Sequence, residues 1–172
     1  MRISKLFILA LFVMGLRADI VSDYLHKDYK KICTFSNIEQ YKWNEKALSI
    51  IGESCVRIDS LYLLPFIVNK LKHTEYGRKN SIYFLTIVMQ KKLLYSFVFD
   101  GFSLKAFSFP ATDYILSKIF MFVKNGKYTK EGDTYVMYDE KSSKTYKLYK
   151  SGDKMYIDTY QNGTLIKRRW FR

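Results

Sequence analysis

The chain has 172 residues, a formal net charge of +13 at pH 7 and a hydrophobic content of 48%. This length is enough to bury the core of one domain, and no linker suggests an array of independent domains. The basic balance favours anionic partners, although the charges are scattered and no long basic run appears.

Residues 1–18 have the form of a secretory signal peptide. Arg2 and Lys5 precede an apolar run that is too short to cross a bilayer as a helix. We expect cleavage between Ala18 and Asp19, and cleavage after Gly15 is the alternative. Removing the segment lowers the net charge from +13 to +10, because its charged residues are all basic.

A cleaved signal peptide predicts that the mature chain is exported, and we expect the periplasm as its location. The segment contains no cysteine and none follows directly, so there is no acceptor for a bacterial lipoprotein anchor. The alternative location is the inner membrane, held by an uncleaved segment from Met1 to Ala18.

Three helices are predicted before the most apolar part of the chain. The first covers about residues 20–35, where apolar residues recur at helical spacing. The second begins after Asn44, a good N-cap, and extends to about Ile58. The third covers about residues 60–72, and its Pro65 either kinks the helix or marks where the regular helix begins.

Residues 80–101 form the most apolar continuous stretch beyond the N-terminus. After a loop at residues 73–80, this stretch predicts a central helix that is buried on most sides and ends at Gly101. Gln90, Lys91 and Lys92 interrupt it, so it lacks the roughly 20 uninterrupted apolar residues of a transmembrane span. A membrane-inserting hairpin is the alternative interpretation.

An extended aromatic connection at residues 102–111 then leads to a fifth helix, at about residues 112–126. Five helices with short connections predict antiparallel neighbours. They could form a compact bundle or a short array, and the sequence does not decide between the two.

From Lys127 the hydrophobic pattern changes to a period of two, with turn signals at regular intervals. The strongest is Asn162-Gly163, which suits a type I′ hairpin turn. We therefore predict an α+β protein: a signal peptide at 1–18, a helical domain at 19–126, and an antiparallel β-meander of four or five strands at 127–172. One sheet face should pack on the helices and the other should stay partly open.

The two cysteines, Cys33 and Cys55, each lie beside the apolar stripe of a predicted helix. In an exported chain this arrangement predicts a disulfide between them. Buried free thiols and a redox pair are the alternatives, and the absence of a CxxC motif argues against a redox pair.

We find no motif for catalysis, a metal or a cofactor. GxSxG, HExxH, P-loop and dinucleotide fingerprints are absent, and His26 and His73 lie outside any recognisable pattern. Asp100 and Asp113 could meet in space as a carboxylate pair, but each is better interpreted as a residue at a helix end. We therefore expect no catalytic residue, metal ligand or cofactor, and an enzyme is the third class of function.

The C-terminal segment interleaves basic and aromatic residues on the predicted sheet. Its possible binding surface consists of Tyr149, Tyr160, Lys167, Arg168, Arg169 and Trp170. Such a surface can bind nucleic acid through phosphate contacts and base stacking, but an exported protein rarely meets nucleic acid. A solvated edge strand that is kept from aggregating by its charges is the simplest interpretation.

The stretch QKKLLYSFVFDG, followed by PATDYILSKIF, resembles helical secreted proteins of Gram-negative bacteria that have no assigned function. The resemblance covers about Glu45 to Phe120. It implies a mainly helical exported domain and no active site, and it leaves the predicted sheet outside.

We therefore expect a non-catalytic periplasmic binding or assembly protein that contacts an acidic protein partner. The contact would use a helical groove or the open, tyrosine-rich sheet face. The alternative is a peripheral binder of anionic lipid or glycan surfaces through the basic sheet.

Overall fold

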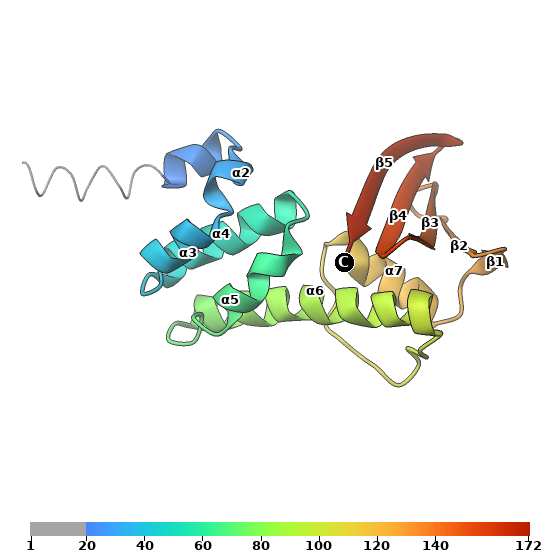
Figure 1. Cartoon of the computed structure of the whole chain (residues 1–172), viewed down its shortest axis with the longest axis horizontal. Helices are drawn as coiled ribbons and strands as arrows, with labels where there is room; N and C mark the ends of the chain where they lie inside the picture. The colour runs from blue at the N-terminus through green and yellow to red at the C-terminus, as the bar shows by residue number, and fades with distance from the viewer. Residues whose placement is uncertain (1–19) are drawn as a thin grey trace, which may run out of the picture. The chain divides into compact units, whose positions relative to one another are not determined.

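The computed structural model describes residues 20–172, and helices are followed there by a five-stranded antiparallel sheet (Figure 1). This confirms the predicted α+β class. The predicted signal peptide and its predicted cleavage site, between Ala18 and Asp19, lie outside the described residues. The chain divides into two compact units, Met1–Leu85 and Thr86–Arg172. The division falls inside one long helix, α6 (Glu75–Asp100).

The first unit begins with short helical pieces. Residues 20–25 are helical, Lys27 then takes a left-handed φ of +64°, and α2 (Tyr29–Ile32) follows. The expectation of one continuous helix over residues 20–35 is wrong. Neither Lys27 nor Asp28 carries the glycine or proline signal that would have placed the break.

A further short helix, α3 (Phe35–Gln40), lies between the first and second predicted helices, where no helix was predicted. The side chain of Thr34 caps it by accepting a hydrogen bond from the backbone N–H of Asn37 at 3.2 Å. The Asn37 amide donates in turn to the carbonyl of Ile32 at 2.9 Å. Local side-chain bonds of this kind stabilise a short helix that its apolar pattern does not reveal.

The next helices agree with the sequence pattern. In α4 (Glu45–Arg57), Asn44 is the N-cap and accepts from the backbone N–H of Ala47 at 3.1 Å. A 3₁₀ turn, η1 (Leu61–Leu63), then leads into α5 (Leu64–Val68), which has Pro65 in its first turn. Of the two interpretations of Pro65, the second is therefore correct, since this residue marks the start of the regular helix.

The core of the first unit is formed by fully buried side chains from α2 to α6 and from the loop after α5: Ile32, Ile38, Leu48, Ile51, Leu64, Ile67, Leu71 and Phe84. Helix α4 approaches the first part of α6 closely, because a Cβ at Gly52 would overlap the ring of Phe84. The predicted disulfide is confirmed: Cys33 and Cys55 are bonded, with Cα atoms 5.0 Å apart. It joins the end of α2 to the last turn of α4.

Helix α6 covers the apolar stretch but begins earlier than predicted, within the segment that was expected to be a loop. Thr74 starts it, because its hydroxyl accepts from the backbone N–H of Gly77 at 3.0 Å. The predicted end is confirmed: Gly101 has φ of +69°, and the N–H of Phe102 donates back to the carbonyl of Ser96 at 3.3 Å.

By length and mean hydropathy, α6 is the one helix of the described residues that could cross a membrane, and 44% of its most apolar window is buried within the protein. A core helix of a soluble protein meets the same criteria, so the finding is weak evidence for a span.

The second unit contains the rest of α6, an extended connection, α7 (Ile115–Lys124) and the sheet. Helix α7 buries Leu116, Ile119, Phe120 and Val123. The hydroxyl of Ser117 accepts from the backbone N–H of Thr112 at 3.0 Å and from the amide of Gln90 at 3.3 Å. These bonds tie the connection and α7 to α6 within this unit.

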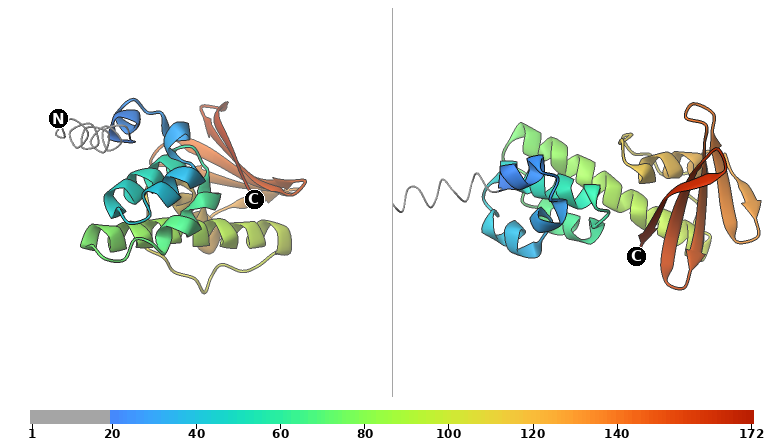
Figure 2. Two further views of the ribbon diagram at one scale, coloured as in Figure 1. Left: turned by 60° about the vertical axis from the view of Figure 1, so that its left-hand side comes forward. Right: turned by 90° about the horizontal axis from the view of Figure 1, so that it is seen from above.

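The sheet is the predicted meander, with neighbours in chain order (Figure 2). Its strands are β1 (Thr129–Glu131), β2 (Thr134–Asp139), β3 (Lys144–Ser151), β4 (Lys154–Gln161) and β5 (Thr164–Phe171). The turn at Asn162-Gly163 has positive φ at both residues, 50° and 77°, as a type I′ turn requires.

One face of the sheet is closed by the helices of the second unit. The ring of Phe97 on α6 lies 4.7 Å from that of Tyr135, and Phe122 on α7 lies 6.3 Å from Tyr146. The residues buried on this inner face are Met137, Tyr146, Leu148, Met155, Ile157 and Phe171. Alternation along the strands places every second side chain on the opposite face.

Candidate binding surface and cavity

The opposite face of strands β3, β4 and β5, here called the open face, is rich in aromatic and basic residues. Cross-strand register places Tyr149, Tyr156 and Trp170 in one row and Lys147, Asp158 and Arg168 in the next. Thr145, Tyr160 and Leu165 form a third row. The candidate surface is therefore formed by strand residues in fixed register and not by a loop.

The rings of the open face are held by one another and by lysines. Tyr149 and Tyr156 stack with centroids 5.3 Å apart and an interplanar angle of 8°. The ammonium of Lys154 lies 4.2 Å from the ring centroid of Trp170. That of Lys147 lies 5.3 Å from the ring of Tyr160. These stacking and cation–π contacts fix the orientation of the rings before any partner is present.

The single carboxylate of these three strands, Asp158, is 2% exposed and lies beneath Arg168. The guanidinium of Arg168 donates to both carboxylate oxygens at 2.8 Å, and the hydroxyl of Tyr149 donates to one at 3.2 Å. Hydrogen bonds to Asp158 raise the pKa of Arg168. Burial, and then the charge of Asp158, raise the pKa of Tyr149. Arg168 is thus charged and Tyr149 is a neutral donor.

As a result, the charge that solvent reaches on the open face is positive. Asp158 is covered, whereas Trp170 is 51% exposed and Arg168 keeps a 53% exposed side chain beside Lys147 and Lys154. An aromatic surface with accessible cations favours a partner that brings carboxylates and apolar groups together.

The structure brings only part of the predicted binding surface together. Tyr149, Tyr160, Arg168 and Trp170 share the open face, whereas Lys167 and Arg169 pair with Thr159 and Ile157 in the inner-face register. The prediction followed nearness in sequence, but a strand sends consecutive side chains to opposite faces. Applying that alternation across the predicted hairpins would have found the missed members, Tyr156, Lys147 and Lys154.

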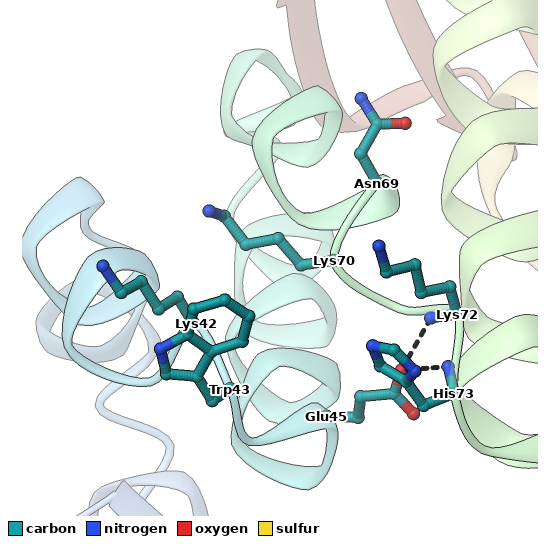
Figure 3. A pocket seen from close by; sticks show the side chains of 7 residues that line it. All are labelled: Lys42, Trp43, Glu45, Asn69, Lys70, Lys72 and His73. Atoms are coloured by element: carbon teal, nitrogen blue, oxygen red, sulfur yellow. Dashed lines mark hydrogen bonds between the residues drawn. The ribbon is translucent and has the colours of Figure 1, made fainter.

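A separate cavity of about 230 Å³ lies in the first unit, and Figure 3 shows the side chains that line it: Lys42, Trp43, Glu45, Asn69, Lys70, Lys72 and His73. Trp43 stands between α3 and α4 with 86% of its surface exposed. Lys42 lies beside its ring, with the ammonium 5.8 Å from the centroid.

Glu45 closes one side of this cavity, although it is only 7% exposed. Its carboxylate accepts backbone N–H bonds from Lys72, His73 and Thr74 at 2.6–2.8 Å, and also the hydroxyl of Thr74. Burial alone would raise the pKa of Glu45, but these donors outweigh it and lower the pKa to about 2. A Cβ at Gly77 would overlap this carboxylate, so only glycine fits there.

The other ionisable candidates occupy ordinary positions. His26 lies near the end of helical residues 20–25, with Nδ1 2.8 Å from the carbonyl of Ser22. Asp100 ends α6, and Asp113 precedes α7. Over residues 20–172, no group of three or more His, Cys, Asp or Glu side chains could hold a metal ion.

Comparisons of the chain with protein-family models, with curated proteins and with solved structures find no match.

Proposed function

We propose that this chain is an exported, non-catalytic binding protein whose open face binds an acidic segment of a protein partner. One observation carries the proposal: the solvent-accessible charge on an aromatic sheet face is positive, because its single carboxylate lies covered beneath Arg168. A segment that carries Asp or Glu beside apolar side chains would complement this surface.

The residue types of the open face support a protein partner over a lipid surface. Tyr, Trp and Arg are the residues most enriched among those that dominate binding energy at protein interfaces. Here the rings lie stacked over the sheet and are held by lysines. A lipid binder would need a larger set of projecting apolar side chains that insert between acyl chains, whereas in the three rows of the open face only Leu165 and Trp170 are exposed in this way.

The state of the buried carboxylates supports a non-catalytic role. Asp158 and Glu45 are both saturated by hydrogen-bond donors, and the pKa of Glu45 is about 2. A general acid or base needs a pKa nearer the working pH and a proton that can be exchanged with a substrate. Each of these two groups serves instead to orient its neighbours.

Export is the proposed context because the predicted signal peptide and the Cys33–Cys55 disulfide are compatible with the same oxidising compartment. The resemblance to secreted helical proteins of Gram-negative bacteria is part of the same proposal.

The test is crosslinking in a Gram-negative cell that expresses the complete precursor. The crosslinked partner is identified, purified and titrated against the mature chain at about 0.05 M and 0.5 M salt. We expect a protein with an acidic segment, and binding that weakens at least tenfold in K147E/K154E. The matched control is K127E/K141E, which reverses two exposed lysines of the same unit outside the open face.

Equal loss in both double variants would show that only net charge matters and would overturn the assignment to the open face. Binding to anionic vesicles or to an acidic glycan, with no protein crosslink, would replace the proposal by the peripheral-binder alternative. In that case binding should be abolished at about 0.5 M salt, because it would be mainly electrostatic.

A further inference from the structure

The cavity beside Trp43 has features that the first unit does not need for its fold. An indole that is 86% exposed contributes little to a core, yet it stands at the rim of a hollow of about 230 Å³. Lys42, Lys70 and Lys72 also line this hollow (Figure 3). Exposed tryptophans beside concave basic surfaces are features of binding sites rather than of packing.

The charge balance of the cavity is positive. Glu45 is the one carboxylate that lines it, and that carboxylate is occupied by three backbone N–H groups and Thr74. Lys70 lies 3.4 Å from Glu39, which lies outside the lining residues. The ammonium groups of Lys42 and Lys72 have no carboxylate within salt-bridge distance among the described residues, so they remain able to bind an anion.

Two helix N-termini add to this positive potential. Glu45 is the first residue of α4, and its carboxylate binds the backbone just before α6. The positive ends of both helices therefore meet at this carboxylate, whose single charge is shared between them. An incoming anion at Lys72 would meet a cation and the positive helix ends, while the negative charge of Glu45 is bound by backbone N–H groups.

We propose that this cavity binds an acidic sugar ring, a hexuronate, with its carboxylate on Lys72 and its apolar ring face on the indole of Trp43. The His73 imidazole supplies a polar group for the hydroxyls. The volume suits one ring, because it is smaller than the roughly 300–1,000 Å³ of sites for drug-sized ligands. This inference concerns the first unit and does not rest on the proposed function of the open face.

A second, wider hollow of about 700 Å³ shares Trp43, Glu45 and His73 with the first. A ring bound at Trp43 could therefore belong to a longer chain that continues into this hollow. The same chemistry has two sources, a free hexuronate or one unit of an acidic polysaccharide, and the experiment separates them.

The experiment is a ¹⁵N-correlated NMR titration of the chain without its signal peptide. The chain has two tryptophans, so W43F assigns the indole N–H signal of Trp43, and the signal of Trp170 serves as an internal control. The probes are glucuronate, neutral glucose, acetate and a hexuronate oligosaccharide. We expect glucuronate to shift the Trp43 signal with a Kd on the order of 1 mM, glucose and acetate to shift it at least tenfold more weakly, and Trp170 to stay unchanged.

The variant K72M should weaken glucuronate binding about tenfold, since it removes the ammonium but keeps the backbone N–H that Glu45 needs. The matched control is K30M, an exposed lysine of the same unit that lies outside the cavity. An oligosaccharide that binds more tightly than glucuronate would identify a polysaccharide as the source, and equal affinity would identify the free sugar.

Three results would overturn the proposal: no shift of Trp43 with any probe, equal shifts with acetate, or equal shifts with glucose. A matching shift of Trp170 would also overturn it, since the effect would then not be specific to the cavity. None of these results bears on K147E/K154E, so failure here is distinguishable from failure of the proposed function.

Discussion

At the scale of single residues, Glu45 joins two segments that are far apart in the chain. It begins α4 and fixes the backbone of residues 72–74 before α6. We predict that E45A lowers the free energy of unfolding by about 3 kcal/mol, because buried N–H donors lose their acceptor. E45Q should lower the free energy of unfolding by about 2 kcal/mol, because its amide N–H₂ group faces backbone N–H donors and cannot accept hydrogen bonds from them. Urea denaturation measures both.

The control for these variants is E75Q, at a carboxylate that is 76% exposed and paired only with the exposed Lys79. It should change the free energy of unfolding by less than about 0.5 kcal/mol. Equal losses in E45Q and E75Q would contradict the role given to Glu45.

The same residue predicts a dependence of stability on pH. Its pKa falls from its ordinary value of 4.5 to about 2 in the folded chain, so the unfolded chain binds the proton more tightly. The stabilisation from Glu45 should be complete above about pH 4.5 and should be lost as the pH falls from there towards 2. The difference in unfolding free energy between the native chain and E45Q, measured from pH 7 to pH 2, should shrink over that range. A constant difference would count against the prediction.

Arg168 and Asp158 form an ion pair on the open face, in which the carboxylate of Asp158 lies buried beneath the guanidinium of Arg168. R168A should lower the free energy of unfolding, because it leaves the Asp158 carboxylate buried with Tyr149 as its remaining side-chain donor. The double variant D158A/R168A should lower it by less than the sum of the two single variants. A double-mutant cycle by urea denaturation measures this coupling, and additive losses would exclude the pair as a unit.

At the scale of elements, the sheet depends on the helices of its own unit. Its inner face buries Met137, Leu148, Met155 and Ile157 against α6 and α7. A fragment of residues 127–172 would expose that face, so we predict that it binds a hydrophobic dye and unfolds without a cooperative transition. Circular dichroism on heating tests this prediction, and a cooperative transition in the isolated fragment would refute it.

The strands were easier to predict than the helix boundaries, for a physical reason. Each hairpin carries its own local signal, such as Asn162-Gly163, and each strand alternates because one of its faces is buried. Helix α3 and the early start of α6 depend on local hydrogen bonds made by the side chains of Thr34, Asn37 and Thr74. From the sequence alone, a Thr or Asn could equally well be part of a helix cap, a turn or a loop.

The binding surfaces were predicted in part for a related reason. The composition of the C-terminal segment placed Tyr149, Tyr160, Arg168 and Trp170 on a candidate surface, and alternation separates these from Lys167 and Arg169. The cavity at Trp43 could not have been predicted, because it joins residues 42–45 to residues 69–73. No periodicity within either segment indicates that the two meet.

At the scale of the whole molecule, one covalent bond supports the first unit. Reducing Cys33–Cys55 opens a loop that spans 22 residues, which should lower stability by about 3 kcal/mol in the chain-entropy model. We predict a lower melting temperature in reducing buffer by calorimetry. C33A/C55A should start from the lower melting temperature and should not respond to the reductant. An unchanged melting temperature on complete reduction would contradict a stabilising role.

The order of the strands has a consequence for how the chain reaches its native state. Each strand pairs with its neighbour in sequence, so every pairing closes only a short loop. Topologies with such local pairing fold faster than sheets in which distant segments must find each other. The row of Tyr149, Tyr156 and Trp170 nevertheless spans three strands. The stacked pair of Tyr149 and Tyr156 needs only β3 and β4, so the row is complete only when β5 adds Trp170 beside β4.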